Sequence, residues 1–294
     1  MPAITTPFAQ SGEVDHDGLA KNIRRLLSAG STGVIAAGCT GEFWSLTETE
    51  RSAVYKTAVN TVGHKGTTIV GAAAITPSGV IEALHAAKEA GCNGALVLPP
   101  YFAHLTEREV IRHFETVAAN APLPIMLYNI PGNAGNALTP QIVDVLADLD
   151  PVVAIKESSG DWINFQKTLN VCRDRIKVFC GPSSTIGVPA MLAGCDGLID
   201  CFPNVWTGCI DMWSLFQSGK IETAWEYQAR AQALTDLFVS GGRTLYPATK
   251  AAMDHLGYPG GGAPRAPLQP LEEPALQELL QGLDRILDRN DSAA

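Results

Sequence analysis

Apolar and polar positions follow a repeating pattern along the chain, in which each short apolar segment precedes a longer amphipathic one. The apolar segments have the length of buried strands, and the amphipathic segments carry apolar residues at the spacing of a helix. Residues 17–29, for instance, place Leu19, Ile23 and Leu26 on one stripe. The pattern predicts strands at residues 3–6, 33–37, 68–72, 94–98, 125–129, 152–157, 177–180 and 197–201.

The alternation of eight predicted strands with helices favours a parallel sheet that closes into a barrel. Strands separated by helices pair in parallel, and eight such units make a (β/α)₈ barrel, commonly about 250 residues long. An open doubly wound sheet is the alternative, but no Gly-x-Gly-x-x-Gly fingerprint follows a predicted strand. Thr47 and Thr106 each stand three residues before a glutamate, as in a helix capping box. We therefore predict an α/β fold, the (β/α)₈ TIM barrel.

The strand pattern stops after residue 201. Helices are predicted at residues 205–216, 220–239, 243–255 and 273–288, of which the first completes the eighth unit. The segment 257–270 is rich in glycine and proline, and we interpret it as an ordered loop, with a linker as the alternative. The chain is thus divided into a barrel over residues 1–217 and a helical extension over residues 218–294, packed on the barrel.

Composition and charge narrow the class of protein. Apolar residues make up 46% of the 294 positions, enough for a sizeable core, and charged residues only 17%, which favours surface buried between subunits. The net charge of −9 argues against nucleic-acid binding, which needs a basic face. The start of the chain lacks a signal-peptide pattern, and no apolar run is long enough to span a bilayer. We expect no nucleic-acid or membrane partner.

Cysteine usage indicates a reducing compartment. The seven cysteines contain no Cys-x-x-Cys pair, and most lie inside apolar runs. Buried, reduced thiols in a cytoplasmic protein are the expected interpretation. They stand at positions 39, 92, 172, 180, 195, 201 and 209.

Lys156 is the sharpest chemical signal, because it ends a predicted strand whose preceding residues are all apolar. Burial disfavours the charged form of an amine and so lowers its pKa. A lysine that is partly neutral near pH 7 can attack a ketone and form an imine, which then acts as an electron sink. A lysine whose stem is buried while its ammonium reaches water is the alternative, and this strand alone leaves both open.

Tyr128 ends the preceding predicted strand, so its hydroxyl could face the Lys156 amine from the adjacent position. A phenol placed there can transfer protons to the reacting groups. The alternative is a core tyrosine with one hydrogen bond.

A glycine-flanked segment, Gly-Cys-Thr-Gly-Glu at residues 38–42, follows the second predicted strand. Glycine lets backbone N–H groups approach an anion, and the Thr40 hydroxyl could help them to hold a carboxylate. An ordinary glycine turn is the alternative, since this spacing alone is a weak signal.

Together these segments resemble the dihydrodipicolinate synthase / N-acetylneuraminate lyase family, and the resemblance spans nearly the whole chain. It implies a (β/α)₈ barrel with a C-terminal helical extension, assembled as a homotetramer built from two dimers. It implies that Lys156 forms an imine with pyruvate or another 2-oxo acid and that Tyr128 relays protons. It further implies that Thr40, with the adjacent Gly38 and Cys39, holds the carboxylate. The matching positions are Thr5, Pro7, Phe8, 38–43, Leu46, Thr47, 128–131, Gly135, 155–158, Gly160 and Asp161.

Three positions depart from the synthase branch of that family. Cys39 stands where the first threonine of a Thr-Thr pair is expected, and Phe102 stands where a tyrosine reaches across the dimer interface. Asn133 replaces the arginine that binds the second substrate's carboxylate. A thiol and a phenyl ring cannot replace two hydroxyls in a hydrogen-bond chain. These departures predict a family member other than the lysine-biosynthetic synthase.

The predicted eighth strand adds substrate-binding candidates at Ile199 and Asp200. A carboxylate near the barrel mouth could contact the hydroxyls of a sugar acid or act as a base. An aspartate held by backbone amides is the alternative. Ser183, after the seventh predicted strand, could hydrogen-bond the hydroxyl groups of the same sugar acid.

The leading functional hypothesis is reversible aldol cleavage of a 2-oxo-3-deoxy sugar acid or another 4-hydroxy-2-oxo acid. A Schiff-base dehydratase or deaminase is the next alternative, followed by the lysine-pathway synthase and a non-catalytic barrel. A metal-dependent aldolase is disfavoured, because the six histidines show no His-x-His or His-x-x-x-His pairing. We therefore expect no cofactor and no metal.

Overall fold

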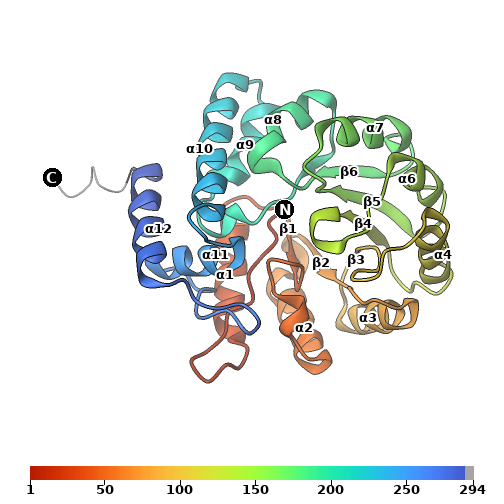
Figure 1. The fold of residues 1–294 in the computed structure, drawn as a ribbon, viewed down its shortest axis with the longest axis horizontal. Coiled ribbons are helices and arrows are strands. Elements are labelled where there is room, and N and C mark those ends of the chain that lie inside the picture. The colour runs from red at the N-terminus through yellow and green to blue at the C-terminus, as the bar shows by residue number, and fades with distance from the viewer. Residues whose placement is uncertain (289–294) are drawn as a thin grey trace.

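The computed structural model describes residues 1–288 as a curled parallel sheet with helices packed around it (Figure 1). Within these residues, seven strands pair in chain order, each parallel to the next. They are β1 (Gly33–Ala36), β2 (Thr67–Gly71), β3 (Gly94–Val97), β4 (Ile125–Asn129), β5 (Val152–Glu157), β6 (Lys177–Cys180) and β7 (Gly197–Leu198). Neighbours in sequence are neighbours in the sheet, as expected when a helix connects each strand to the next.

The N-terminal segment closes the sheet into a barrel. Ala3 forms a parallel bridge with Ile35 of β1, and Pro2 forms one with Asp200, just beyond β7. The N–H of Ala3 donates to the Asp200 carbonyl at 2.8 Å. The predicted first strand therefore exists as single bridges rather than a regular ladder, and Pro2 contributes to this because it has no N–H. The prediction of a (β/α)₈ barrel is confirmed.

The helices around the sheet begin where the sequence signals place them. The Thr47 hydroxyl accepts from the N–H of Glu50, and the Glu50 carboxylate accepts from the N–H of Thr47. Thr106 and Glu109 form the same capping box. No helix in residues 1–288 combines the length and apolar character needed to cross a bilayer. The helices are α1 (His16–Ser28), α2 (Glu48–Val62), α3 (Pro77–Ala90), α4 (Glu107–Ala118), α5 (Pro131–Ala134), α6 (Pro140–Leu146), α7 (Trp162–Cys172), α8 (Ser183–Ala193) and α9 (Gly208–Gln217), with short 3-10 turns η1 (Phe43–Ser45), η2 (Gly63–Lys65) and η3 (Phe202–Asn204).

Side-chain alternation along the strands separates two apolar layers. One cluster fills the inside of the barrel and includes Met126 and Ala154. The other lies between strands and helices and includes Leu127 and Ile155. Since alternate residues face the same way, the inward direction of Ala154 carries over to Lys156, two residues further on.

The last strand is shorter than the predicted segment 197–201. β7 ends at Leu198, and Asp200 takes part only in the single bridge to Pro2. The chain then turns into η3, so the helix predicted at 205–216 begins only at Gly208. Pro203 lies in that turn and removes a backbone donor that a longer strand would need.

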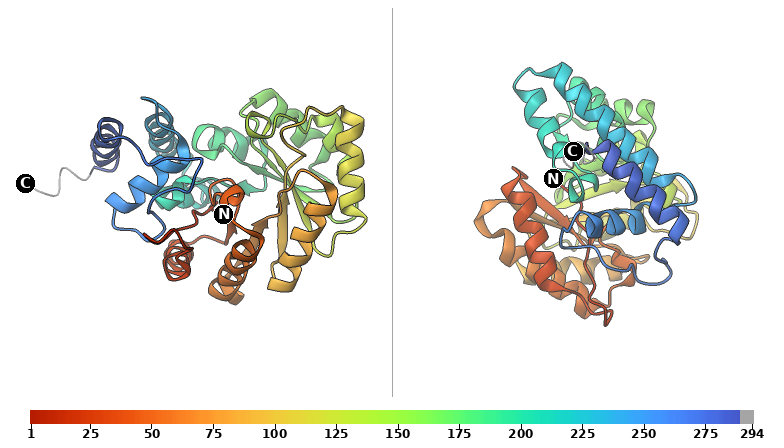
Figure 2. Two further views of the ribbon diagram at one scale, coloured as in Figure 1. Left: turned by 60° about the horizontal axis from the view of Figure 1, so that its bottom comes forward. Right: turned by 90° about the vertical axis from the view of Figure 1, so that its left-hand side faces the viewer.

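The C-terminal extension consists of α10 (Ile221–Val239), α11 (Leu245–His255) and α12 (Glu273–Ile286), which lie side by side at one flank of the barrel (Figures 1 and 2). α10 packs against α8 and α9, while α12 packs against α10 and α11. The segment 257–270 is an ordered loop, since the Thr5 hydroxyl donates to the Gly260 carbonyl at 2.7 Å. Residues 289–294 of the predicted extension lie outside the described residues, and the division at residue 217 remains a prediction.

A buried ion pair fastens the extension to the barrel. The Lys250 ammonium in α11 lies 2.6 Å from the Glu42 carboxylate, and the two side chains are 1% and 0% exposed. The backbone N–H of Arg265 donates to the other oxygen of Glu42 at 3.0 Å. The ring of Phe8 lies 4.0 Å from the Lys250 nitrogen. A buried charge is costly unless an opposite charge lies beside it. This pair therefore fixes α11 against the loop that carries Glu42.

Replacing Lys250 with methionine should destabilise the protein by about 3–5 kcal/mol, because the Glu42 carboxylate would stay buried without its partner. Urea unfolding followed by circular dichroism measures the loss. The double variant Glu42→Gln/Lys250→Met removes both charges and should recover most of it. Equal destabilisation by the single and double variants would show that charge pairing is not what holds this contact.

Candidate functional site

Lys156 and Tyr128 meet at the C-terminal ends of β5 and β4. The two residues are direct partners in the strand register. The Lys156 amine lies 3.4 Å from the Tyr128 hydroxyl oxygen and 4.5 Å from the centre of the phenol ring. Their exposed fractions are 6% and 4%, so the amine does not reach bulk water. The structure brings together the two residues that sequence predicted to share a site.

Burial sets the ionisation of this pair. Desolvation lowers the pKa of Lys156, and the smaller effects of nearby groups, Cys39 first, oppose it. Desolvation raises the pKa of Tyr128 well above the usual phenol value. The neutral amine and the protonated phenol are thus both favoured, which suits nucleophilic attack by one and proton donation by the other.

The residues beside this pair face the other side of the sheet and lock the two strand ends together. Asn129 donates from its amide nitrogen to the Glu157 carboxylate at 2.5 Å. The same oxygen accepts from Asn164 at 3.1 Å, and the second oxygen accepts from the N–H of Ser159 at 2.7 Å. Side chains alternate between the two faces of each strand. Tyr128 and Lys156 therefore face the inside of the barrel, while Asn129 and Glu157 face outward and fix the positions of the two strand ends.

The loop after β1 is held in a strained backbone conformation. Ala37 and Glu42 both have positive φ, 48° and 53°, although neither is glycine. Gly41 is required between them, because a Cβ there would lie 2.9 Å from the Ala37 backbone. The Thr6 hydroxyl donates to the Gly41 carbonyl at 2.7 Å. Within residues 1–288 the hydroxyl and N–H of Thr40 have no hydrogen-bond partner, so both remain available to a ligand.

Tyr246 joins this group from α11, and no sequence signal identified it. It packs against the cluster inside the barrel that contains Cys39 and Tyr128. Burial raises the pKa of the Cys39 thiol. The Tyr246 ring packs on Trp44, with ring centres 5.3 Å apart. A search of strand ends could not find Tyr246, because it lies near the start of a helix in the extension.

A cavity of about 200 Å³ opens beside Cys39, at the C-terminal side of the barrel. Its residues follow β1, β3 and β4, the end at which barrel enzymes carry their active sites. Among the described residues that line it, none has a charged side chain. The lining consists of Cys39, Phe43, Trp44, Leu98, Tyr101, Ile130, Asn133 and Ala134.

Phe102 lies apart from this cavity. Its side chain is 93% exposed and its φ is 79°, on the loop after β3. The neighbouring Tyr101 lines the cavity instead. A role of Phe102 in substrate binding remains a prediction.

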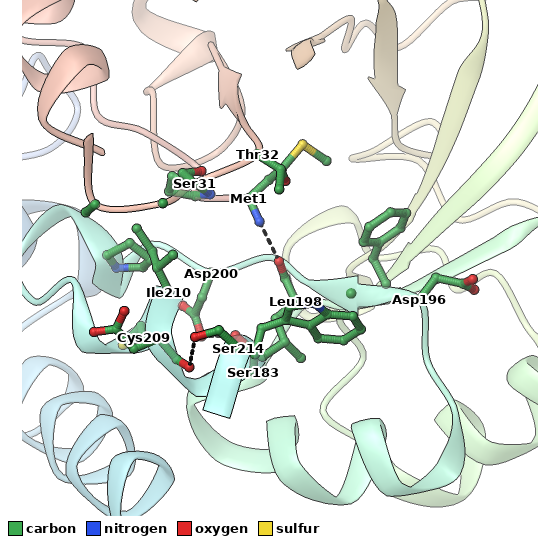
Figure 3. Close-up of a pocket in the computed structure, with 18 residues that line it drawn as sticks. Met1, Ser31, Thr32, Ser183, Asp196, Leu198, Asp200, Cys209, Ile210 and Ser214 are labelled. Atoms are coloured by element: carbon green, nitrogen blue, oxygen red, sulfur yellow. Dashed lines mark hydrogen bonds between the residues drawn. The ribbon is translucent and has the colours of Figure 1, made fainter. Parts of the chain in front are cut away.

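Asp200 and Ser183 line a separate pocket of about 300 Å³, which also includes Met1 and Leu198 (Figure 3). The Asp200 carboxylate accepts from the Ser183 hydroxyl at 3.1 Å and from the backbone N–H of Ser184 at 2.7 Å. This is the arrangement of an aspartate held by backbone amides at the start of α8. A role for either residue in substrate binding remains a prediction.

Ile199 belongs to the cluster inside the barrel and is fully buried, so it faces the same interior as Ala154. All seven cysteines are buried and unpaired. In the part of the chain that the structure describes, no group of three or more histidine, cysteine or acidic side chains could hold a metal ion.

Comparison with known proteins gives consistent matches over the whole barrel. The profile of the dihydrodipicolinate synthetase family matches residues 1–286. The 4-hydroxy-tetrahydrodipicolinate synthase of Heliobacterium modesticaldum is 33% identical over 291 residues, covering 97% of this chain and 95% of that protein. YagE, a prophage protein of E. coli K12 from the dihydrodipicolinic acid synthase family, solved in complex with pyruvate, superposes with a TM-score of 0.92 at 27% identity and 97% coverage of each chain. A catalytic lysine mutant of the Ruminococcus gnavus sialic acid aldolase shares the fold, with a TM-score of 0.90, 21% identity, and coverage of 100% of this chain and 97% of that one.

Proposed function

Because the chain is a lyase that belongs to the dihydrodipicolinate synthetase family, we propose that Lys156 forms its imine with a small 2-oxo acid. The family prediction drawn from sequence is confirmed. The observation that carries the proposal is the Lys156 amine, buried beside the Tyr128 hydroxyl at 3.4 Å. The pyruvate complex of the related prophage protein supports a 2-oxo acid as the ligand class.

The proposed reaction begins when the neutral Lys156 nitrogen attacks the C2 carbonyl. The resulting carbinolamine loses its hydroxyl as water after Tyr128 donates a proton, which leaves an imine. In a 4-hydroxy-2-oxo acid, the Tyr128 phenolate left by that step then takes the C4 hydroxyl proton, the C4 oxygen becomes the aldehyde carbonyl, and the C3–C4 bond breaks. The bond electrons move into the imine, an aldehyde leaves, and the enamine takes a proton at C3 before hydrolysis releases pyruvate.

The loop after β1 suits the carboxylate of such a substrate. Thr40 has an unengaged hydroxyl and N–H among the described residues, and the N-terminal part of the loop adds the backbone of Gly38 and Cys39. Hydrogen bonds from these groups would orient the 2-oxo acid so that C2 faces the Lys156 amine. Thr40 is therefore proposed to bind substrate rather than to react.

The cavity supports an aldehyde half without a carboxylate. Its described lining has no cationic side chain, and the family resemblance implies that Asn133 stands where the synthases carry an arginine. We therefore propose reversible aldol cleavage of a 2-oxo-3-deoxy sugar acid or another 4-hydroxy-2-oxo acid in place of condensation with aspartate semialdehyde. A dehydratase or deaminase would share the Lys156 imine and differ only in the group lost.

Borohydride reduction in the presence of pyruvate should trap a covalent adduct on Lys156, because hydride converts the imine to a stable amine. Peptide mass analysis locates the adduct. The variant Lys156→Met should form none, whereas Lys167→Met, at an exposed lysine on α7, should retain it. An adduct on another lysine would overturn the assignment.

The rate of trapping should rise with pH through the pKa of Lys156 and then level off, because only the neutral amine attacks. Below that pKa the amine is protonated and trapping slows. Since burial lowers this pKa, the midpoint should fall clearly below the ordinary lysine value of 10.5. Stopped-flow trapping across pH measures it, and a midpoint at or above 10.5 would contradict a desolvated amine.

The Tyr128→Phe variant should reduce kcat by about 10²–10⁴-fold, the usual contribution of a positioned proton donor. Its KM should change little, since the carboxylate contacts remain. A panel of 2-oxo acids, scored separately for pyruvate, ammonia and water loss, identifies the reaction. Ammonia release without pyruvate would replace aldol cleavage by deamination, and efficient turnover of aspartate semialdehyde would restore the synthase.

A further inference from the structure

The segment 257–270, which joins α11 to α12, forms a strap that lies against the loop after β1. Arg265 of this strap hydrogen-bonds both Glu42 and Ser45 of the loop. We propose that Arg265 is a positioning residue for substrate binding, which holds the loop in the conformation that presents Thr40 to the carboxylate of a 2-oxo acid. This inference rests on the proposed function.

The Arg265 guanidinium joins three segments of the chain. It donates to the Ser45 carbonyl at 3.0 Å, to the two carboxylate oxygens of Glu50 at 2.6 and 2.9 Å, and to the Gly12 carbonyl at 3.0 Å. Its central carbon lies 4.2 Å from the centre of the Phe8 ring. Because a planar fork of donors that meets both oxygens of one carboxylate fixes direction as well as distance, Arg265 ties the loop to the first turn of α2 and to the N-terminal segment.

The loop needs such contacts because its backbone is strained. Glu42 has a φ of 53°, an unfavourable conformation for a residue other than glycine, which surrounding contacts must hold in place. The N–H of Gly41 donates to the Gly38 carbonyl at 3.0 Å. The N–H of Glu42 donates to the Cys39 carbonyl at the same distance. Thr40 lies inside both of these turns, so the backbone position of Glu42 determines where the Thr40 hydroxyl and N–H point.

The strap is anchored to the barrel just before it reaches Arg265. The N–H of Gly262 donates to the two carboxylate oxygens of Asp254 at 2.8 and 3.0 Å. Gly262 has a φ of 79°, and a Cβ at this position would lie 2.7 Å from the Phe8 carbonyl oxygen. The strap therefore lies directly on the N-terminal segment, and this packing sets the position from which Arg265 reaches the loop.

The Arg265 side chain can be removed without leaving a buried charge unpaired. The Arg265 backbone N–H and the Lys250 ammonium hold the two oxygens of Glu42, at 3.0 and 2.6 Å, and a substitution of the Arg265 side chain leaves both in place. The side chains of Arg265 and Glu50 are 21% and 27% exposed, so either one reaches water when the other is lost. The loop can thus be loosened while the fold is retained.

The test measures the rate of borohydride trapping against pyruvate concentration, using the full chain. Arg265→Met keeps most of the length of the side chain and removes the guanidinium. It should raise the pyruvate concentration at half-maximal rate about tenfold, as expected when one hydrogen bond to a charged group is lost. The maximal rate should stay unchanged, because the residues that form the imine are untouched. The matched control Arg175→Met removes a guanidinium that pairs with Asp144 and Asp148 near the opposite end of the barrel, and both values should stay at the wild-type level.

A neutral probe separates substrate positioning from a general structural effect. Methyl pyruvate carries the same reactive carbonyl without the charged carboxylate, so Arg265→Met should leave its half-maximal concentration unchanged. In a Thr40→Val background, which lacks the hydroxyl, Arg265→Met should raise the value for pyruvate less than it does in the wild-type chain, because both changes act on one contact. Equal rises for the two probes, an undiminished rise in the Thr40→Val background, or a fall in the maximal rate would overturn the proposal.

Glu50→Gln tests the same contact with a smaller change. Glutamine can still complete the capping box at the start of α2, but it weakens the ion pair with Arg265. The half-maximal pyruvate concentration should rise about threefold, the usual effect of a partly exposed ion pair. Circular dichroism verifies that each variant is folded, and if Arg265→Met is not, an unchanged value in folded Glu50→Gln refutes the role of Arg265.

The wild-type protein keeps the two proposals apart. If it forms no adduct with pyruvate, the proposed imine chemistry is wrong. If it forms the adduct and the half-maximal pyruvate concentration is unchanged in both Arg265→Met and Glu50→Gln, only the role of Arg265 is wrong.

Discussion

Closure of a parallel sheet into a barrel forces alternate side chains of every strand into one enclosed interior. That constraint decides what Lys156 experiences. Ala154 fills the inner core, so the amine two residues further projects into the same space, where water is excluded and the charged form is disfavoured. Tyr128 reaches the same place from the paired strand. The environment of the Lys156 amine therefore follows from the geometry of the strands more than from any special local sequence.

The C-terminal extension takes part in the site as well as covering the barrel. A buried ion pair between Glu42 and Lys250 joins α11 to the loop after β1, and that loop carries both the carboxylate-binding candidate Thr40 and the thiol of Cys39. A charge pair with no access to water tolerates little change in separation. Any motion of the extension relative to the barrel is consequently opposed at the loop that borders the candidate site.

The pocket beside Cys39 and the pocket beside Asp200 differ in the polar groups that line them. Beside Cys39 the described lining is mostly apolar and uncharged, which suits a reacting carbonyl and a neutral partner. Asp200 lies in the other pocket, where one carboxylate oxygen accepts from the Ser183 hydroxyl and the Ser184 N–H, and the other accepts from the N–H of Cys201. Because these donors satisfy the Asp200 carboxylate, it stabilises the chain just after β7, which is joined to the N-terminal segment by a single bridge to Pro2.

The sequence by itself determined the barrel, the family and the meeting of Lys156 with Tyr128. The spacing of apolar residues, the order of the strands and the residue at each strand end can all be read from the sequence. Because the parallel strands pair in chain order, residues at the ends of consecutive strands become neighbours in space. The sequence could not place Tyr246, because its contact with the cluster inside the barrel depends on how a distant helix packs and on the ion pair that holds that helix. It also left open which way Asp200 faces, since the last strand proved shorter than its apolar pattern. Only the tertiary structure decided these points, because contacts between remote segments arise from packing and charge pairing that no local pattern encodes.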